Sequence, residues 1–177
     1  MRSRLVILDA NVIIDAFAGG FWDALVARYE VCITSIVLHS EVFFYEDAKG
    51  QRVPINLEPY LISKKVVEIA ASTDELAALT ERVNLNLLDR IDDGEQEALA
   101  LLLTGRFDDH QFCTGDTRAI KALTRLSLGA LGISLEELLT QIGMKKKLPN
   151  PSDSKAAFDR KKAEGIQEQE MFLRRKT

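Results

Sequence analysis

The sequence predicts an α/β fold in which helices cover both faces of a parallel sheet. Short apolar runs of four or five residues alternate with longer stretches that have helical hydrophobic spacing, and this alternation is typical of βαβ units. The runs are continuously apolar, as expected for strands buried on both faces. With 177 residues, 46% hydrophobic and 28% charged, the chain can bury the core of one domain, which excludes a disordered, collagen-like or coiled-coil protein.

Apolar runs give the predicted strands, helical spacing gives the helices, and capping or turn residues mark their ends. In chain order, the first elements are a strand at 5–8 ended by Asp9, a helical stretch at 21–29, a strand at 31–34, a helix capped by Ser35 that runs through Glu41 toward residue 45, a loop or hairpin insertion at 50–59, and a strand at 66–70. The later elements are a helix at 73–84 opened by a capping box of Ser72 and Glu75, a helix at 95–103 between Gly94 and Gly105, a strand at 110–114, a helix opened by Asp116, and a closing helix at 134–139 with its own capping box.

Charge divides the chain after Gly143. The formal net charge is −4, but residues 144–177 carry ten Lys and Arg against five Asp and Glu, so the tail is +5 and the rest is −9. Prolines at 149 and 151 interrupt the chain, and residues 154–174 can form a charged helix with a thin apolar stripe. We therefore expect a domain at 1–143 and a basic tail at 144–177, which either clasps the acidic body or binds phosphate.

Cysteine content and hydropathy bear on the compartment. Cys32 and Cys113 lie in apolar stretches without metal-ligand spacing, which favours buried thiols in a reducing compartment. No apolar run is long enough for a membrane helix, and the first residues show no cleavage signature. These features predict a cytoplasmic protein without a membrane anchor.

Four carboxylates occupy positions where a parallel α/β sheet places functional groups. Asp9 and Asp116 follow predicted strands, Glu95 opens a helix, and Glu41 lies in an otherwise apolar helix. Each has a structural alternative: the helix dipole favours an acid in a first turn, and a buried Lys or Arg can neutralise an acid among apolar neighbours. If the four converge, mutual repulsion raises their pKa values until a cation neutralises them, and an all-oxygen site selects Mg²⁺ or Mn²⁺. Such a site is typical of phosphodiester hydrolysis.

Four segments that carry these acids resemble the four acidic motifs of PIN domains, in the same order: 8–11 (LDAN), 40–42 (SEV), 94–101 (GEQEALAL) and 114–119 (TGDTRA). Residues 131–139 also resemble the glycine, short strand and final helix that close such domains. The resemblance covers about residues 4–143. It implies a three-layer α/β/α sandwich with a central, mainly parallel, Rossmann-like sheet. It also implies a Mg²⁺- or Mn²⁺-dependent ribonuclease, often the toxin of a prokaryotic toxin–antitoxin pair.

The resemblance also implies roles for individual residues. The catalytic, metal-binding acids would be Asp9, Glu41, Glu95 and Asp116, with Asn11 orienting Asp9 or a metal-bound water and the Thr114 hydroxyl supporting Asp116. Glu97 is two positions from Glu95 and cannot share its helix face, so only one of them can bind the metal, and Glu95 fits the motif better. Asp15 could join the acidic cluster, but we expect it at most to support a metal-binding residue and not to bind the metal itself.

Other polar residues have weaker functional interpretations. Arg118 and Lys121 are candidates for substrate phosphate contacts, with a solvated helix face as the alternative. His39 lies two positions before Glu41 and is expected to be a surface or structural histidine.

The leading hypothesis is a metal-dependent endoribonuclease whose partners are RNA, a cognate antitoxin protein and a second copy of the chain. The alternative is a non-catalytic RNA-binding or protein-interaction module with the same fold. A phosphatase acting through an aspartyl-phosphate is disfavoured, because that chemistry needs an acid where the chain has Asn11.

Overall fold

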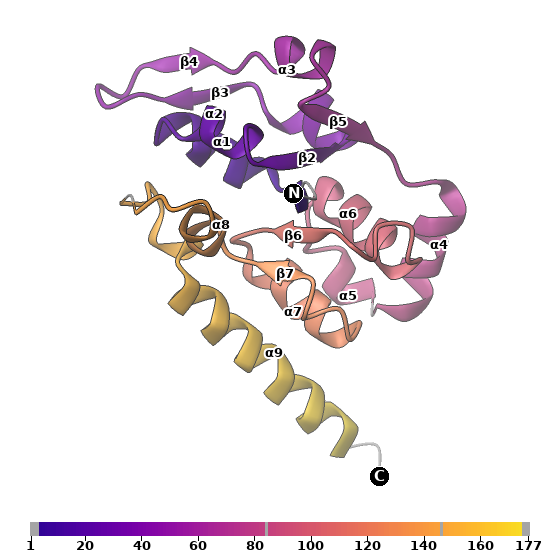
Figure 1. The fold of residues 1–177 in the computed structure, drawn as a ribbon. Coiled ribbons are helices and arrows are strands. Elements are labelled where there is room, and N and C mark those ends of the chain that lie inside the picture. Colours follow the sequence, from indigo (N-terminus) through magenta and orange to yellow (C-terminus); the bar gives the residue numbers. More distant parts are fainter. Residues whose placement is uncertain (1–3, 84, 146, 175–177) are drawn as a thin grey trace.

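The computed structural model describes residues 4–83, 85–145 and 147–174. It confirms the predicted α/β class: helices flank a five-stranded sheet in which all strands are parallel, in a three-layer arrangement (Figure 1). The strands, in spatial order across the sheet, are β5 (Val66–Ile69), β2 (Tyr29–Thr34), β1 (Arg4–Leu8), β6 (Gln111–Cys113) and β7 (Gly132–Ile133).

Successive residues of the central strand β1 face opposite layers, as the pleat of a strand requires. Val6 and Leu8 pack into one apolar cluster, and Ile7 packs into the other. The first cluster includes residues of α1 (Ala10–Ala18), α2 (Trp22–Val26) and α8 (Leu135–Gln141). The second includes residues of α4 (Thr73–Arg82), α6 (Asp93–Leu103) and α7 (Thr117–Arg125). The sheet is therefore buried on both faces, which explains its continuously apolar strands.

The remaining elements are short, apart from the last helix. They are the π-helical turn η1 (Val37–Glu41), the hairpin strands β3 (Phe44–Glu46) and β4 (Arg52–Pro54), the helices α3 (Glu58–Ile62) and α5 (Leu85–Leu88), the 3-10 turn η2 (Pro151–Asp153) and the helix α9 (Lys155–Arg174). In the described ranges, no helix is both long and apolar enough to cross a membrane. Cys32 and Cys113 are both buried and free, as expected.

The predicted caps at Ser72 and Ser134 form as hydrogen bonds, but the predicted Ser35 cap does not: the N-cap of η1 is Ile36, without a side-chain hydrogen bond, and the Ser35 hydroxyl donates to Glu68 instead. The Ser72 hydroxyl accepts from the Glu75 backbone N–H, and the Glu75 side chain accepts from the Ser72 N–H, which completes the capping box of α4. The Ser134 hydroxyl caps α8 by accepting from the Glu137 N–H. Local side-chain chemistry therefore sets where these helices begin.

Two predicted elements were wrong in extent. The helix expected from Ser35 toward residue 45 ends at Glu41, and the chain then enters β3, because Asp47 and Gly50 build a tight hairpin turn that pairs β3 with β4. Asp47 accepts backbone N–H bonds within this turn, and Gly50 adopts a φ of 73°. The predicted helix at 21–29 is shorter, since residue 29 already belongs to β2.

Helix α1 was not predicted. Its run Val12 to Ile14 is β-branched, which lowers helix propensity. The Asp9 cap and the burial of Val12 and Ile13 outweigh that preference.

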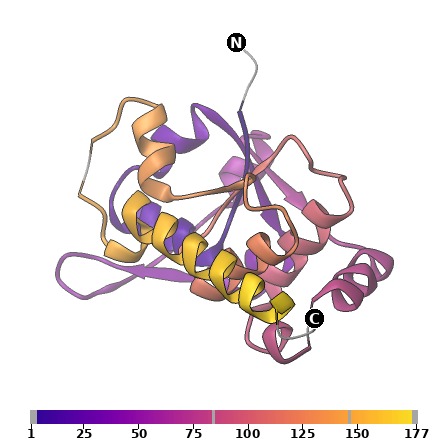
Figure 2. The ribbon, with the colours of Figure 1, turned by 90° about the horizontal axis from the view of Figure 1, so that it is seen from below.

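The tail folds back onto the body. After the prolines, α9 packs along α7 and buries Ala157 and Phe158, while its far end extends away from the sheet layers (Figures 1 and 2). Ion pairs link the two helices, with the basic groups on α7 and the acid on α9: Lys121 of α7 meets Glu168 of α9 at 2.6 Å, and Arg125 meets Glu168 at 3.0 Å. The tail is thus attached through packing as well as charge.

Candidate active site

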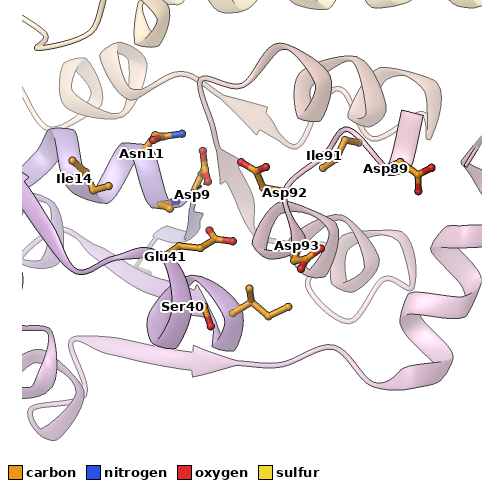
Figure 3. A pocket seen from close by; sticks show the side chains of 11 residues that line it. Asp9, Asn11, Ile14, Ser40, Glu41, Asp89, Ile91, Asp92 and Asp93 are labelled. Carbon is orange, nitrogen blue, oxygen red and sulfur yellow. Dashed lines mark hydrogen bonds between the residues drawn. The ribbon is translucent and has the colours of Figure 1, made fainter. Parts of the chain in front are cut away.

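An acidic pocket of about 790 Å³ opens where β1 ends and α1 begins. Its lining contains five carboxylates and no Lys or Arg among the described residues (Figure 3). The acids that line it are Asp9, Glu41, Asp89, Asp92 and Asp93. In Figure 3 the carboxylates of Glu41 and Asp92 point toward the space beside Asp9, while the Asn11 amide lies on the same rim. The pocket is therefore strongly anionic.

Asp9 is held by the pairing of the two central strands. Its backbone N–H donates to the Cys113 carbonyl at 3.1 Å, which continues the contact between β1 and β6. Its Oδ1 accepts from the Ala10 N–H at 2.6 Å, which caps α1, and Asp9 is only 4% exposed. Oδ2 is left to face the interior of the site.

The Thr114 hydroxyl connects three of the predicted residues. Its Oγ lies 3.2 Å from Asp9 Oδ2 and 3.1 Å from Glu95 Oε1, and it accepts from the Asp116 N–H at 3.0 Å. A hydroxyl has one proton, so it can donate fully to only one of the two carboxylates at a time. The Thr114 hydroxyl therefore supports Asp116 by accepting a bond from its backbone N–H, in line with the role that the resemblance implied. The same hydroxyl lies between the side chains of Asp9 and Glu95.

Glu95 lies in the first turn of α6 and is 2% exposed. Its Oε2 is fully enclosed but has no hydrogen-bond partner among the residues that the structure describes. A buried carboxylate oxygen without a partner costs free energy unless a proton or a cation satisfies it.

Glu41 reaches the site from the end of η1. Its Oε1 accepts from the Gly94 N–H at 3.2 Å, at the start of α6. A Cβ at Gly94 would lie 2.8 Å from Glu41 Oε2 and 2.4 Å from a methyl carbon of Val37. Glycine at this position is therefore what allows Glu41 to approach the helix.

Asp116 follows β6 and caps α7, with Oδ1 accepting from the Arg118 N–H at 2.6 Å and from the Ala119 N–H at 3.0 Å. This is the structural role that the helix-dipole alternative described. Asp116 still acts electrostatically on Asp9 and Glu95, so the capping role does not remove it from the site.

Burial dominates the electrostatics of the site. It raises the pKa of Asp9 to about 7, and the charges of Glu41 and Asp116 add to the effect, although hydrogen bonds from Ala10 and Thr114 oppose it. Burial, with the charges of Asp9 and Asp116, raises the pKa of Glu95 to about 9. Burial also raises the pKa of Glu41. None of these acids, nor Asp116, forms a salt bridge with a basic side chain in the described part of the chain.

The four predicted acids thus surround Thr114 and Gly94. Over residues 4–83, 85–145 and 147–174, however, no three His, Cys, Asp or Glu side chains are already arranged to hold a metal ion. The donors nevertheless suit a hard divalent cation, because they are all oxygen, lack basic partners and include the unpartnered Glu95 Oε2.

Several other candidates are engaged elsewhere. Glu97 accepts from the Ile36 N–H at 3.1 Å and from the Ala71 N–H at 2.9 Å, so both its oxygens serve the backbone. Arg118 donates to the Arg90 carbonyl, and His39 pairs with Glu68 at the surface. Lys121 is 18% exposed and pairs with Glu164 and Glu168 of the tail, so its charge is already neutralised there.

The sequence interpretation missed Asp92, and it did not connect the tail with the site. Asp92 precedes α6 without a capping hydrogen bond and lines the pocket, and the acidic run before Gly94 was a signal for it. The carboxyl groups of Asp15 and tail Asp153 are near enough to interact. Burial and Asp15 raise the pKa of Asp153 to about 8. No motif in the tail indicated this contact.

The chain matches no protein-family model, and a search of curated proteins finds no match.

Proposed function

We propose that the protein is a divalent-metal-dependent endoribonuclease. The supporting observation is the buried Glu95 Oε2, which has no hydrogen-bond partner among the described residues; Glu95 shares the Thr114 hydroxyl with buried Asp9, and Asp9 lines the acidic pocket. Acids placed in this way are costly for a protein that has no cation to bind.

Asp9, Glu41 and Glu95 would hold the ion, with Asp116 at the edge of the site. A bound divalent ion supplies polarisation of a phosphate and activation of water. The chain contributes positioning: Thr114 fixes the distance between Asp9 and Glu95, and the α1 cap fixes Asp9. The Asn11 amide, on the pocket rim, can orient Asp9 or a water molecule.

The negative charge of the pocket makes substrate entry depend on a bound cation. Five carboxylates repel a polyanion, so RNA should enter only when a divalent ion has neutralised part of that charge. The pocket volume of about 790 Å³ has room for a nucleotide unit, and RNA is the substrate that the four motifs imply. A cognate antitoxin, a second copy of the chain and a cytoplasmic location stay predictions from the sequence.

The test is cleavage of a labelled single-stranded RNA, with DNA of the same sequence and a small phosphomonoester in parallel. Wild type should cleave RNA with Mn²⁺ or Mg²⁺ and stop with a chelator. Asp9→Asn and Asp116→Asn should each lower the cleavage rate roughly 100-fold or more, because each removes a carboxylate that would hold the ion or tune its site, and the ion stabilises the charge that develops on the phosphate. His39→Ala is the control and should retain most activity, because His39 is exposed and pairs with Glu68.

Cleavage that persists in chelator, or an active Asp9→Asn, would reject the proposal. Hydrolysis of the phosphomonoester alone would favour the phosphatase, and metal-independent RNA binding without turnover would favour the binding module.

A further inference from the structure

A lysine of the tail is buried against the backbone of the acidic site. Lys161 is 8% exposed, and its Nζ donates to the Gly115 carbonyl at 2.5 Å. It also donates to the Ser152 hydroxyl oxygen at 3.0 Å, and Ser152 Oγ itself lies 3.3 Å from the same Gly115 carbonyl. Gly115 stands between Thr114 and Asp116, so the tail contacts the peptide that joins two residues of the site.

The tail turn η2 also fits closely over this peptide. A Cβ built on Gly115 would lie 2.1 Å from Asp153 Oδ1, and Asp153 is 2% exposed. Gly115 does not have a positive φ, so glycine is needed there for space and not for backbone conformation. The absence of a side chain at Gly115 is what lets η2 and Lys161 reach the loop.

We propose that Lys161 is a positioning residue of the acidic site: by holding the Gly115 carbonyl, it fixes the Thr114 hydroxyl and Asp116 relative to Asp9 and Glu95. The inference rests on the proposed function. The bond is charge-assisted and buried, the class of hydrogen bond that restrains geometry most strongly. Outer-shell contacts of this kind orient the groups that bind a metal.

If Lys161 acted only through its charge, its removal would change metal affinity in the opposite direction from the change that a positioning role predicts. Lys161 is near enough to Asp116 for the two charges to interact, so removing its positive charge should strengthen binding of a divalent cation on electrostatic grounds. If Lys161 instead holds the loop in place, its removal should weaken that binding. A general structural role would lower stability and leave metal affinity unchanged below the melting temperature.

The chain supplies a matched control in the next residue. Lys162 lies on the same helix and donates to the Gly129 carbonyl at 2.7 Å, in the loop after α7 and away from the acidic pocket. Lys161→Met and Lys162→Met each remove one positive charge and a lysine bond to a backbone carbonyl. Calorimetric titration with Mn²⁺ should show roughly 10- to 100-fold weaker binding for Lys161→Met and unchanged binding for Lys162→Met.

A second readout needs no metal. The Asp116 amide donates to Thr114 Oγ, so its hydrogen exchange reports the geometry of the loop. In metal-free protein, Lys161→Met should speed exchange at Asp116, whereas Lys162→Met should not. Gly115→Ala, whose methyl group would push η2 and with it Lys161 away from the loop, should speed it as well and provides the test if Lys161→Met fails to fold.

Unchanged exchange at Asp116 in both site variants, or unchanged or tighter Mn²⁺ binding by Lys161→Met, would overturn the inference. If wild type binds no Mn²⁺, the proposed function fails, while the exchange measurement still decides the role of Lys161.

Discussion

Glu95 and Glu97 show how two acids on one helix can have different uses. Both are nearly fully buried in α6, two positions apart. Glu97 has both oxygens on backbone N–H groups that follow β2 and β5, so it ties α6 to the sheet. Glu95 has one oxygen near Thr114 and one without a partner. Spacing alone predicts that they face different ways, but not which one has the unsatisfied oxygen.

This contrast gives an isosteric test. Glu97→Gln places an amide N–H₂ against a backbone N–H, and should lower the free energy of unfolding by about 1–3 kcal/mol. Glu95→Gln should be at least as stable as wild type without metal, because it removes an ionisable group whose charged form burial and the neighbouring acids destabilise. Urea unfolding in chelator measures both.

The metal response should separate the two variants again. Manganese should raise the melting temperature of Glu97→Gln as it does that of wild type, and should have little effect on Glu95→Gln. A large loss of metal-free stability in Glu95→Gln would contradict the interpretation of the site.

The sequence indicated the residues of the site better than their geometry. Asp9 and Glu41 were predictable because a charge among apolar neighbours needs a reason to be there. Asp92 and Lys161 were not, since they lie on a loop and on a tail whose positions depend on contacts distant in sequence.

At the scale of elements, caps and apolar runs predicted most of the sheet and its helices. The strand at 44–46 was missed because its partner β4 stabilises it, and pairing is invisible to local propensity. The prolines at 149 and 151 correctly indicated a break. They could not indicate that the chain returns to the body afterwards.

Helix α9 should contribute to stability through one aromatic anchor. Phe158 is 4% exposed and packs so closely that a Cβ at Gly132 would lie 2.7 Å from its ring. Phe158→Ala should therefore cost about 3–4 kcal/mol of unfolding free energy. Ile166→Ala, on the same helix but 44% exposed, is the control and should cost under about 1 kcal/mol.

Equal, small losses in the two variants would mean that α9 is only loosely attached. In that case the tail would be free to act on RNA instead of serving as a clasp.

At the scale of the whole molecule, buried acids without basic partners make stability depend on pH. The pKa of Asp9 rises from 3.8 to about 7 on folding, and that of Glu95 rises from 4.5 to about 9. Between the unfolded and folded pKa values the folded state binds more protons, so stability is greatest below about pH 4 for these groups and falls as pH rises.

Metal-free wild type should accordingly lose roughly 5–7 kcal/mol from this source between about pH 5 and about pH 8. Asp9→Asn removes one of the titrating groups and should show a shallower decline. Manganese should reverse the trend in wild type, because carboxylates bind the ion in their deprotonated form. Thermal or urea unfolding across this range is the measurement, and stability that rises with pH in chelator would exclude raised pKa values at the site.

The contact between Lys161 and Gly115 also implies an order in which the parts of the acidic site form during synthesis. A growing chain folds from its amino-terminal side, so Asp9, Glu41, Glu95 and Asp116 all leave the ribosome before Lys161 does. Until that residue emerges, the peptide between Thr114 and Asp116 lacks its anchor and a glycine is left uncovered. On the proposal made for Lys161, the acidic site is therefore completed only after the α9 residues that carry this lysine have been synthesised, later than all four carboxylates.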